Sequence, residues 1–164
     1  MLPSGGAGDD FLWRLSIATV HADGPFSTFA GIDRTIAVLA GRGMTLQLER
    51  TVSLRTESEP FAFAGEEPVY ARVLEGATTD LNAMTRRGAF THAMRRLQSD
   101  GRRLITAGAD ETTLVFGGET VVEAAGVVFE AGRFDALVGF APGQSVTVTA
   151  EPGATTQLIE FFRS

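Results

Sequence analysis

Short stretches of alternating polar and apolar residues recur along most of this 164-residue chain, and glycine, proline or aspartate bounds most of them. Such alternation places one row of side chains on each face of an extended segment, so each stretch predicts a half-buried β-strand. The stretches are residues 12–20, 45–50, 70–74, 127–129, 135–140, 145–149 and 157–162. No long amphipathic helical pattern competes with them, and their spacing predicts an all-β sandwich or barrel.

Glycine supplies the backbone conformations that tight turns between such strands need. The chain has 19 glycines, and Gly41 and Gly43 are expected at positive φ, which L side chains rarely adopt. Residues 90–97 fit a helical stripe as well as one face of a strand, and we favour the strand. The length and the lack of a linker predict one domain over residues 1–164, with residues 1–10 flexible.

The segment 13–34 concentrates the residue types of a ligand pocket. It holds the only tryptophan of the chain, two arginines and two phenylalanines on one predicted strand and the turn-rich loop that follows. Arg14 and Ser16 alternate with Leu15 and Ile17, so the polar pair is expected on the face opposite to the apolar pair. The plainer interpretation is an antiparallel strand with one solvated face. Arg14 is the stronger ligand candidate, because a guanidinium can bind a carboxylate through two hydrogen bonds.

A second polar segment follows at residues 80–84. Asp80, Asn82 and Met84 share strand parity, so their side chains project from one face of an extended segment. A buried polar group without a partner costs about 1–3 kcal/mol, so the aspartate and the asparagine need hydrogen bonds. These hydrogen bonds could come from a structural network with turn amides or Arg34, or from a ligand. The same two alternatives apply to Asp33.

The composition argues against several classes of chemistry. Cysteine and lysine are absent, which removes disulfides, thiolate ligands and Schiff-base lysines. The two histidines, His21 and His92, are isolated in the sequence, so we expect no metal site and no cofactor. Neither lies near a Gly-x-Ser-x-Gly motif, so no catalytic residue is assigned. The formal net charge of -6 argues against nucleic acid as a partner.

Two further features bear on partners and location. Apolar runs stay well short of the roughly 18 residues of a membrane span, and the N-terminus lacks signal-peptide features, so we expect a cytoplasmic protein without a membrane partner. One region is locally basic, with Asp100 as its only acidic residue, and contains Arg86, Arg87, Arg95, Arg96, Arg102 and Arg103. We favour a solvated sheet face for it over an interface or an anion site.

Four blocks of sequence occur in order between residues 13 and 88. The first reads Trp-Arg-x-Ser-x-Ala at 13–18 and continues as Gly-x-Phe-Ser-x-Phe-x-Gly-x-Asp-Arg at 24–34. The last reads Asp-x-Asn-x-Met-x-Arg-Arg-Gly at 80–88, and residues 39–43 and 61–65 lie between them. Together they resemble the HutD/Ves family, small cupin-like proteins associated with histidine utilisation in bacteria. The family's opening Trp-x-Asn-Gly-Gly-Gly motif is absent, with only Gly5, Gly6 and Gly8 in that region.

The resemblance implies two cupin-like β-sandwich halves fused in one globule, without a metal. It also implies a regulatory protein linked to histidine catabolism that binds a small anionic metabolite such as urocanate, formylglutamate or formiminoglutamate. The residues expected to contact the ligand are Trp13, Arg14, Ser16, Ser27, Phe29, Asp33, Arg34, Asp80, Asn82, Met84 and Arg86. Phe26 and Phe29 are most simply core residues, with pocket lining as the alternative.

Two other functions stay open at this point. One is an enzyme, an isomerase or hydrolase that acts on such a metabolite with a carboxylate as its base. The other is a structural or interaction protein whose pocket is vestigial. Turnover of the candidate metabolites would favour the enzyme, and failure to bind any of them would favour the interaction protein. A homodimer is left open as well.

Overall fold

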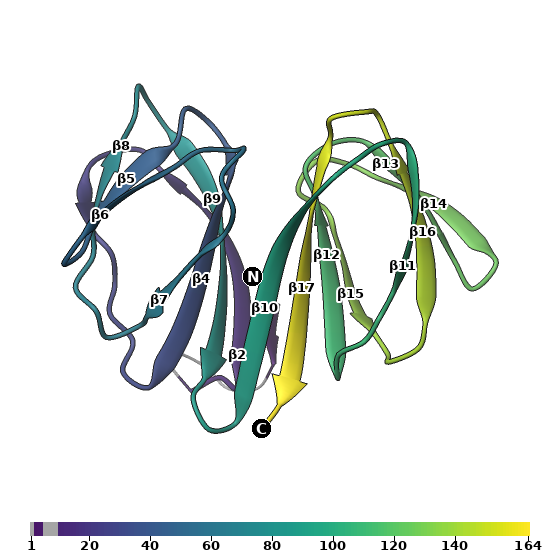
Figure 1. The fold of residues 1–164 in the computed structure, drawn as a ribbon, viewed down its shortest axis with the longest axis horizontal. Helices are drawn as coiled ribbons and strands as arrows, with labels where there is room; N and C mark the ends of the chain where they lie inside the picture. Colours follow the sequence, from purple (N-terminus) through teal and green to yellow (C-terminus); the bar gives the residue numbers. More distant parts are fainter. Residues whose placement is uncertain (1, 5–9) are drawn as a thin grey trace. The chain divides into compact units, whose positions relative to one another are not determined.

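The computed structural model describes residues 2–4 and 10–164, and every regular element in these ranges is a β-strand. The predicted all-β class is therefore confirmed, and no helix in the described residues could cross a membrane. The chain forms two compact units, residues 1–91 with Ser164, and residues 92–163 (Figure 1). Residues 1 and 5–9, which include three glycines of the segment expected to be flexible, lie outside the described residues. The single domain over the whole chain stays a prediction.

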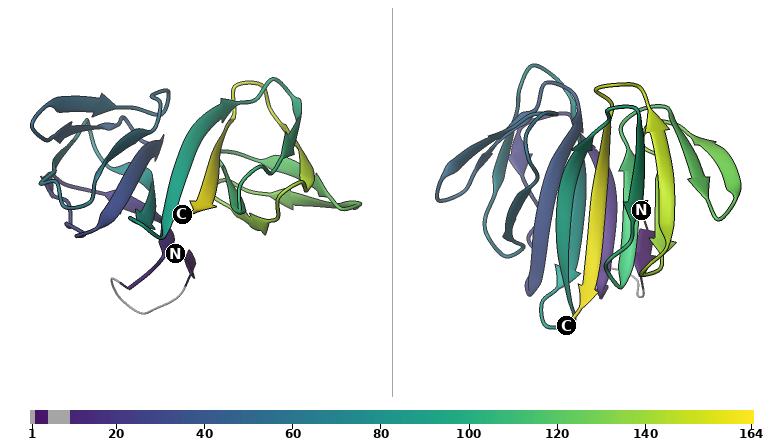
Figure 2. Two further views of the ribbon diagram at one scale, coloured as in Figure 1. Left: turned by 60° about the horizontal axis from the view of Figure 1, so that its bottom comes forward. Right: turned by 45° about the vertical axis from the view of Figure 1, so that its right-hand side comes forward.

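Two antiparallel sheets make up the first unit (Figures 1 and 2). One has five strands in the order β1-β2-β9-β4-β7, and the other has four in the order β3-β8-β5-β6. The strands are β1 (Leu2–Ser4), β2 (Trp13–Val20), β3 (Gly24–Pro25), β4 (Ile32–Ala40), β5 (Met44–Gln47), β6 (Thr51–Leu54), β7 (Phe61–Ala64), β8 (Tyr70–Val73) and β9 (Thr78–Arg86).

Apolar side chains of both sheets form the core of this unit. The cluster consists of Ile36, Val38, Met44, Leu46, Leu54, Phe63, Val69 and Ala71. Alternation accounts for it on β5, where Met44 and Leu46 are fully buried and the residues between them are half-buried. Gly41 and Gly43 have φ values of 93° and 101°, as expected, and a Cβ on Gly43 would collide with the carbonyl oxygen of Leu54.

The second unit repeats the two-sheet arrangement, with strand orders β10-β17-β12-β15 and β11-β16-β13-β14. Its core cluster is built mainly from the inward-facing residues of these strands, among them Leu114, Phe116, Val122 and Leu158. The strands are β10 (Phe90–Gln98), β11 (Arg102–Thr106), β12 (Glu111–Phe116), β13 (Thr120–Ala124), β14 (Val127–Ala131), β15 (Ala136–Phe140), β16 (Ser145–Ala150) and β17 (Thr155–Arg163).

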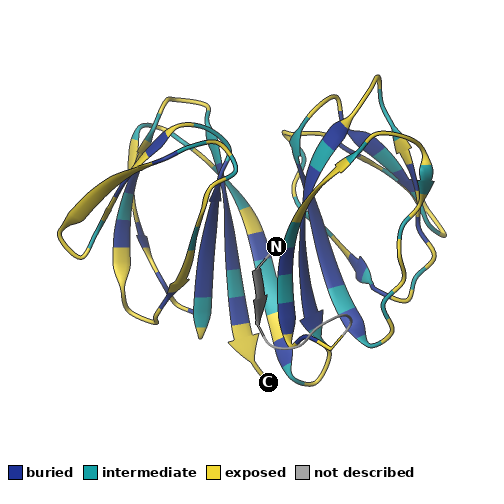
Figure 3. Cartoon of the chain, turned by 180° about the vertical axis from the view of Figure 1, so that it is seen from behind, coloured by how far each residue is buried: buried dark blue, intermediate teal, exposed yellow. Residues whose placement is uncertain are grey.

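Each stretch of alternating residues identified in the sequence corresponds to a strand, and the ambiguous residues 90–97 form β10. The long strands β4 and β9 are mainly buried, whereas the hairpin of β13 and β14 is largely exposed (Figure 3). The paired sheets of each unit agree with the predicted sandwich of cupin-like halves.

Candidate functional site

Four strands bring polar residues from distant parts of the sequence onto one face of the five-stranded sheet. Arg14 pairs with Met84, Met84 with Arg34, and Arg34 with Phe63, so these residues form one row across β2, β9, β4 and β7. Because alternate residues of a strand share a face, this face is the one that carries the core residue Ile36. The next row along the strands contains Ser16, Asn82, Ile36 and Phe61.

We use the name Arg34 cluster for Arg14, Ser16, Arg34, Asp80, Asn82 and Met84. Arg34 lies at its centre, with only 7% of its surface exposed. Three phenylalanines surround the guanidinium, whose central carbon lies 5.6 Å, 5.4 Å and 4.9 Å from the ring centroids of Phe26, Phe29 and Phe63. These distances are within the range of cation–π attraction, which stabilises a desolvated guanidinium. Phe26 and Phe29 also pack against the buried core clusters of this unit, as expected of core residues, and in addition contact the guanidinium.

The hydrogen bonds of Arg34 all go to neutral groups. Its Nη1 donates to the backbone carbonyl of Ser27 at 2.9 Å, and its Nη2 donates to Oδ1 of Asn82 at 2.8 Å. Its Nε is buried and has no hydrogen-bond partner among the described residues. Burial lowers the pKa of Arg34 to about 10; the charge of Asp80 raises the pKa, and that of Arg14 lowers it further. Arg34 is thus a buried cation at neutral pH that touches no carboxylate of the described chain.

Asp80 reaches Arg34 only through Asn82. The Nδ2 of Asn82 donates to Oδ1 of Asp80 at 2.6 Å, while the amide oxygen accepts from Arg34. These two bonds fix the orientation of the amide, so Asn82 bridges the guanidinium of Arg34 and the carboxylate of Asp80. Asp80 is 1% exposed, and burial raises its pKa to about 6 against the opposing effects of the Asn82 hydrogen bond and the Arg34 charge. The predicted alternative of a structural network with Arg34 is present in this form.

Arg14 extends the Arg34 cluster toward the solvent. It is half-buried, its guanidinium carbon lies 5.8 Å from the ring centroid of Phe11, and its Nε has no partner among the described residues. Ser16 is also half-buried, and Ala18, the next residue on this face, is exposed. This edge of the face is therefore open to solvent along β2.

The alternation predicted for β2 is confirmed in register but only partly in packing. Arg14 and Ser16 lie on the face opposite to Leu15 and Ile17. Leu15 is buried as expected, whereas Ile17 is 40% exposed. The expected packing of Ile17 is wrong, because its side chain projects from the half of β2 where the strand is exposed.

Several residues predicted to contact the ligand lie apart from the Arg34 cluster. Trp13 and Asp33 both pair with Thr85 and occupy the opposite face of the sheet. Arg86 shares the face of Met84 but uses its Nε to donate to the carbonyl of Phe11 at 3.1 Å. Ser27 contacts the cluster through its backbone carbonyl, which accepts a hydrogen bond from Nη1 of Arg34. A ligand role for Trp13, Asp33, Ser27 and Arg86 stays a prediction that this geometry does not support.

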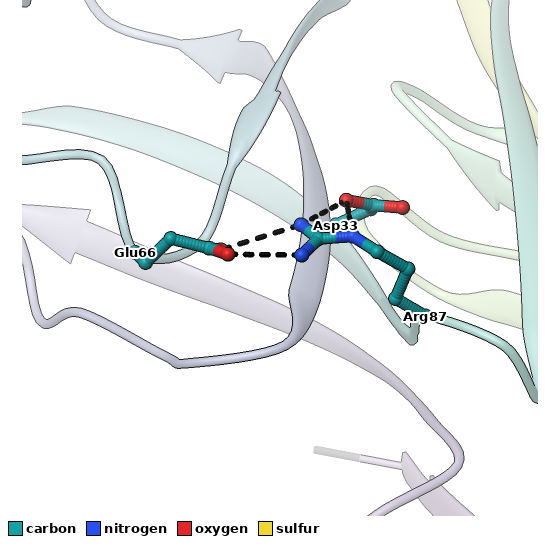
Figure 4. Close-up of polar contacts among 3 residues, drawn as sticks. All are labelled: Asp33, Glu66 and Arg87. Atoms are coloured by element: carbon teal, nitrogen blue, oxygen red, sulfur yellow. Dashed lines mark hydrogen bonds and ion pairs between the residues drawn. The ribbon is translucent and has the colours of Figure 1, made fainter.

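Asp33 instead belongs to an exposed ion-pair triad with Arg87 and Glu66 (Figure 4). Arg87 donates from Nη2 to Oδ1 of Asp33 at 2.7 Å and from Nη1 to Oε1 of Glu66 at 2.9 Å. Its hydrogen bonds to Glu66 and Asp33 raise the pKa of Arg87, and the bond from Arg87 lowers the pKa of Glu66. All three side chains are about half exposed, so solvent screens their attraction.

We expect Arg87→Gln to lower the melting temperature only slightly, because exposed ion pairs contribute little to stability. The difference from wild type should disappear in about 1 M salt, where the Debye length falls to roughly 3 Å. Thermal denaturation at low and high ionic strength measures both effects. A large loss of stability that persists in high salt would instead show that the triad holds the fold together.

The locally basic region of the sequence finds its counter-charges elsewhere in the chain. Arg87 is ion-paired with Asp33 and Glu66. The Nη2 of Arg95 lies 2.8 Å from Oε2 of Glu160, and the Nη2 of Arg102 lies 3.2 Å from Oε2 of Glu123. For Arg87, Arg95 and Arg102, these ion pairs favour the predicted solvated sheet face over an anion site. No group of three or more His, Cys, Asp or Glu side chains in residues 2–4 and 10–164 is arranged to hold a metal ion.

Comparison with known proteins adds a family to this geometry. A sequence model of the HutD family matches residues 1–157. An uncharacterised 21.2 kDa protein of the hutC 3' region of Pseudomonas putida is 46% identical over 80 residues, and the protein Ves of Citrobacter koseri is 41% identical over 80 residues. Each match covers 48% of this chain and 42% of the relative, so the chain spans less than half the length of these curated relatives in the matched region.

Solved structures resemble the chain over nearly its whole length. A conserved protein of unknown function from Pseudomonas aeruginosa is 30% identical with a TM-score of 0.87, over 98% of this chain and 86% of that one. HutD from Pseudomonas fluorescens is also 30% identical, with a TM-score of 0.82 over 100% of this chain and 86% of that one. A cupin 2 barrel protein from Leptotrichia buccalis, 9% identical with a TM-score of 0.57 over 93% and 84% of the two chains, shares the fold.

Proposed function

Because this chain belongs to the HutD family, we propose that the Arg34 cluster binds a small anionic metabolite and that the protein has a regulatory role linked to histidine catabolism. One observation carries the proposal: Arg34 is a buried guanidinium whose hydrogen bonds go only to neutral oxygens. Burial of a charge is unfavourable unless the charge is paired, so an anion that enters the cluster supplies the missing partner.

The charge balance of the cluster supports an anion rather than a cation. Two guanidinium groups, of Arg14 and Arg34, face one carboxylate, and a pKa of about 6 leaves Asp80 readily protonated in mildly acidic solution. Asn82 separates Asp80 from Arg34, so the aspartate leaves donors of both arginines free. The half-buried Arg14 and Ser16 provide the solvent-facing side through which a carboxylate would reach them.

The identity of the ligand is proposed from the family and from the chemistry together. Urocanate, formylglutamate and formiminoglutamate each carry a planar carboxylate, which a guanidinium recognises through parallel hydrogen bonds. The three phenylalanine rings around Arg34 offer apolar contact to the remainder of such a molecule. The name of the P. putida relative refers to the hutC region, which agrees with this choice of ligands.

Thermal denaturation with urocanate, formylglutamate, formiminoglutamate, glutamate and histidine tests the proposal. A ligand at a hundredfold excess over its Kd adds about 2.7 kcal/mol to the stability. Each kcal/mol raises the melting temperature by roughly 2–4 °C in a protein of this size, so a true ligand should raise it by several degrees. Flat curves with all five acids, in matched ionic strength, would contradict the proposal and favour an interaction protein.

Arg14→Leu should weaken binding of that acid by about 1.5–3 kcal/mol, the contribution of one charge-assisted hydrogen bond. The fold should persist, because Arg14 is half-buried and its side-chain Nε has no hydrogen-bond partner among the described residues. Arg72→Leu is the matched control, since Arg72 is an exposed arginine of β8 in the same unit and the charge change is identical. Equal weakening in both variants would mean that net charge, rather than a contact of Arg14, controls affinity.

A second function, an isomerase or hydrolase, is favoured by Asp80 alone. A buried carboxylate with its pKa raised to about 6 is suited to accept and return a proton near neutral pH. In that case Asp80 is the base and Arg34 orients the carboxylate of the substrate. Turnover of one of the five acids that is lost in Asp80→Asn would support the enzyme; binding without turnover supports the regulatory protein.

A further inference from the structure

A cavity in the second unit takes no part in the site described above. Its volume is about 240 Å³, and it lies where the turn between β13 and β14 meets the turn between β15 and β16. The residues that line it are Ala124, Ala125, Leu137, Phe140, Gln144, Ser145 and Val146.

Part of the lining is apolar and continuous with the core of the unit, whereas Ala125, Gln144 and Ser145 are exposed, so the cavity is open to solvent on that side. Phe140 and Val146 belong to the core cluster, and Ala124 and Leu137 pack against it. No charged side chain contributes to the lining. A charged group placed against the apolar part of the lining would lose part of its hydration without gaining a charged partner, so the cavity favours neutral molecules.

The β13–β14 turn beside this cavity has an alanine, Ala125, at positive φ. Ala125 and Gly126 form the turn of the β13–β14 hairpin, with φ values of 48° and 77°. A two-residue hairpin turn with positive φ at both positions is normally occupied by Asn-Gly or Gly-Gly, because alanine is strained there. The chain nevertheless places alanine at this position, and Ala125 is one of the residues that line the cavity.

One hydrogen-bond donor is available at the cavity. The Oε1 of Gln144 accepts from the backbone N–H of Ala141 at 2.6 Å, which fixes the orientation of the side-chain amide. Its NH₂ group lies on the other branch of the amide, and the side chain is exposed to solvent. The hydroxyl of Ser145 is already hydrogen-bonded to the hydroxyl of Thr106 at 2.7 Å.

We propose that this cavity is a second binding site, for a neutral and mostly apolar molecule that carries one hydrogen-bond acceptor. An apolar cavity of ~150 Å³ holds benzene, so this larger one suits roughly ten non-hydrogen atoms. Small aromatic ketones, aldehydes and amides fit this description. The ring packs on Phe140, Leu137 and Val146, and the acceptor meets the amide of Gln144. The site is independent of the Arg34 cluster.

Methyl NMR of the full chain with three probes of similar size tests the proposal. Acetophenone is expected to cause saturable shifts in the methyl resonances of Ala124, Leu137 and Val146. Ethylbenzene lacks the acceptor and should bind about fivefold more weakly, which corresponds to one neutral hydrogen bond. Benzoate should cause no saturable shift in these methyls. No shift with acetophenone, or equal binding of benzoate, overturns the proposal.

Two variants separate the cavity from its surroundings. Gln144→Glu retains the acceptor for Ala141 and removes the free donor, so acetophenone and ethylbenzene should then bind equally weakly. Ala124→Leu fills the cavity and should abolish the shifts, whereas Val121→Leu, on the exposed face of the same strand, should leave them unchanged. If the preference for acetophenone persists in Gln144→Glu, or if Ala124→Leu folds and binds normally, the proposal is wrong.

Discussion

Arg34→Met is expected to lower the affinity for the anionic metabolite by about 30-fold or more. Removal of one partner from a buried, hydrogen-bonded charge pair typically costs about 2–5 kcal/mol. Arg34 is the buried partner of the ligand's carboxylate in the proposed complex. Methionine retains much of the apolar volume among the three phenylalanine rings, so the variant should fold. Isothermal titration calorimetry with the acid identified by thermal denaturation measures the change.

Ile36→Met is the matched control for this variant. Ile36 is a fully buried neighbour on the same face of β4, and exchange of similar apolar volumes usually costs less than about 1.5 kcal/mol. It perturbs the core without removing a charge, so affinity should be retained. A folded Arg34→Met variant with the affinity of wild type would show that the ligand binds elsewhere.

Asp80→Asn should remove a pH-dependent contribution of about 3 kcal/mol from the free energy of unfolding. The native pKa of Asp80, about 6, lies above its ordinary value of 3.8, so the native state holds the proton more tightly than the unfolded state. The contribution is therefore fully present below about pH 4 and is lost as the pH rises through about 6. Urea denaturation of both proteins across this range should give stability curves that converge or cross as the pH rises.

The asparagine variant isolates this effect because other titrating groups are common to both proteins. The difference in unfolding free energy, wild type minus variant, should fall between pH 4 and pH 6.5, by roughly the amount given above. Asp100→Asn, at an exposed position, makes the same chemical change at the surface and provides the control. Parallel curves for wild type and Asp80→Asn would mean that Asp80 titrates normally and is not buried as a carboxylate.

The fold could be predicted where one face of a strand meets solvent. β5 and β16 alternate between apolar and polar residues, and that period is visible in the sequence. β12 and β4 were not identified in this way, because their residues are buried on both faces and the period of two disappears. The long strand β17 (Thr155–Arg163) begins two residues before the predicted range 157–162 and ends one residue after it.

The candidate site could be predicted in part from parity. Asp80, Asn82 and Met84 share a face, as expected, and Arg14 lies on the corresponding face of its own strand. Strand parity also argues against a ligand contact for Trp13 and Asp33, because these residues are the sequence neighbours of Arg14 and Arg34. Neighbours in a strand point to opposite faces, so a motif of consecutive residues cannot lie entirely in one pocket.

Contacts between strands that are distant in the sequence could not be predicted from strand parity. The ring of Phe63 lies over Arg34, and the triad joins Arg87 to Asp33 and Glu66, only because the register of β9, β4 and β7 aligns them. The chemistry of each side chain is local, but its partner is set by strand order and register. For this reason the arginine-rich segment 86–103 is basic in sequence, whereas in the folded chain carboxylates from other segments neutralise part of its charge.

The most direct measurement is the NMR spectrum of the arginine Nε–Hε groups, recorded with and without the bound acid. The resonance of Arg34 is assigned by its loss in Arg34→Met, and those of Arg14 and Arg72 by Arg14→Leu and Arg72→Leu. Since the Nε atoms of Arg14 and Arg34 have no partner in the described chain, a carboxylate that enters the cluster should shift both resonances and leave exposed Arg72 unchanged. If the acid binds and neither resonance moves, or if all three move alike, the Arg34 cluster is not the binding site.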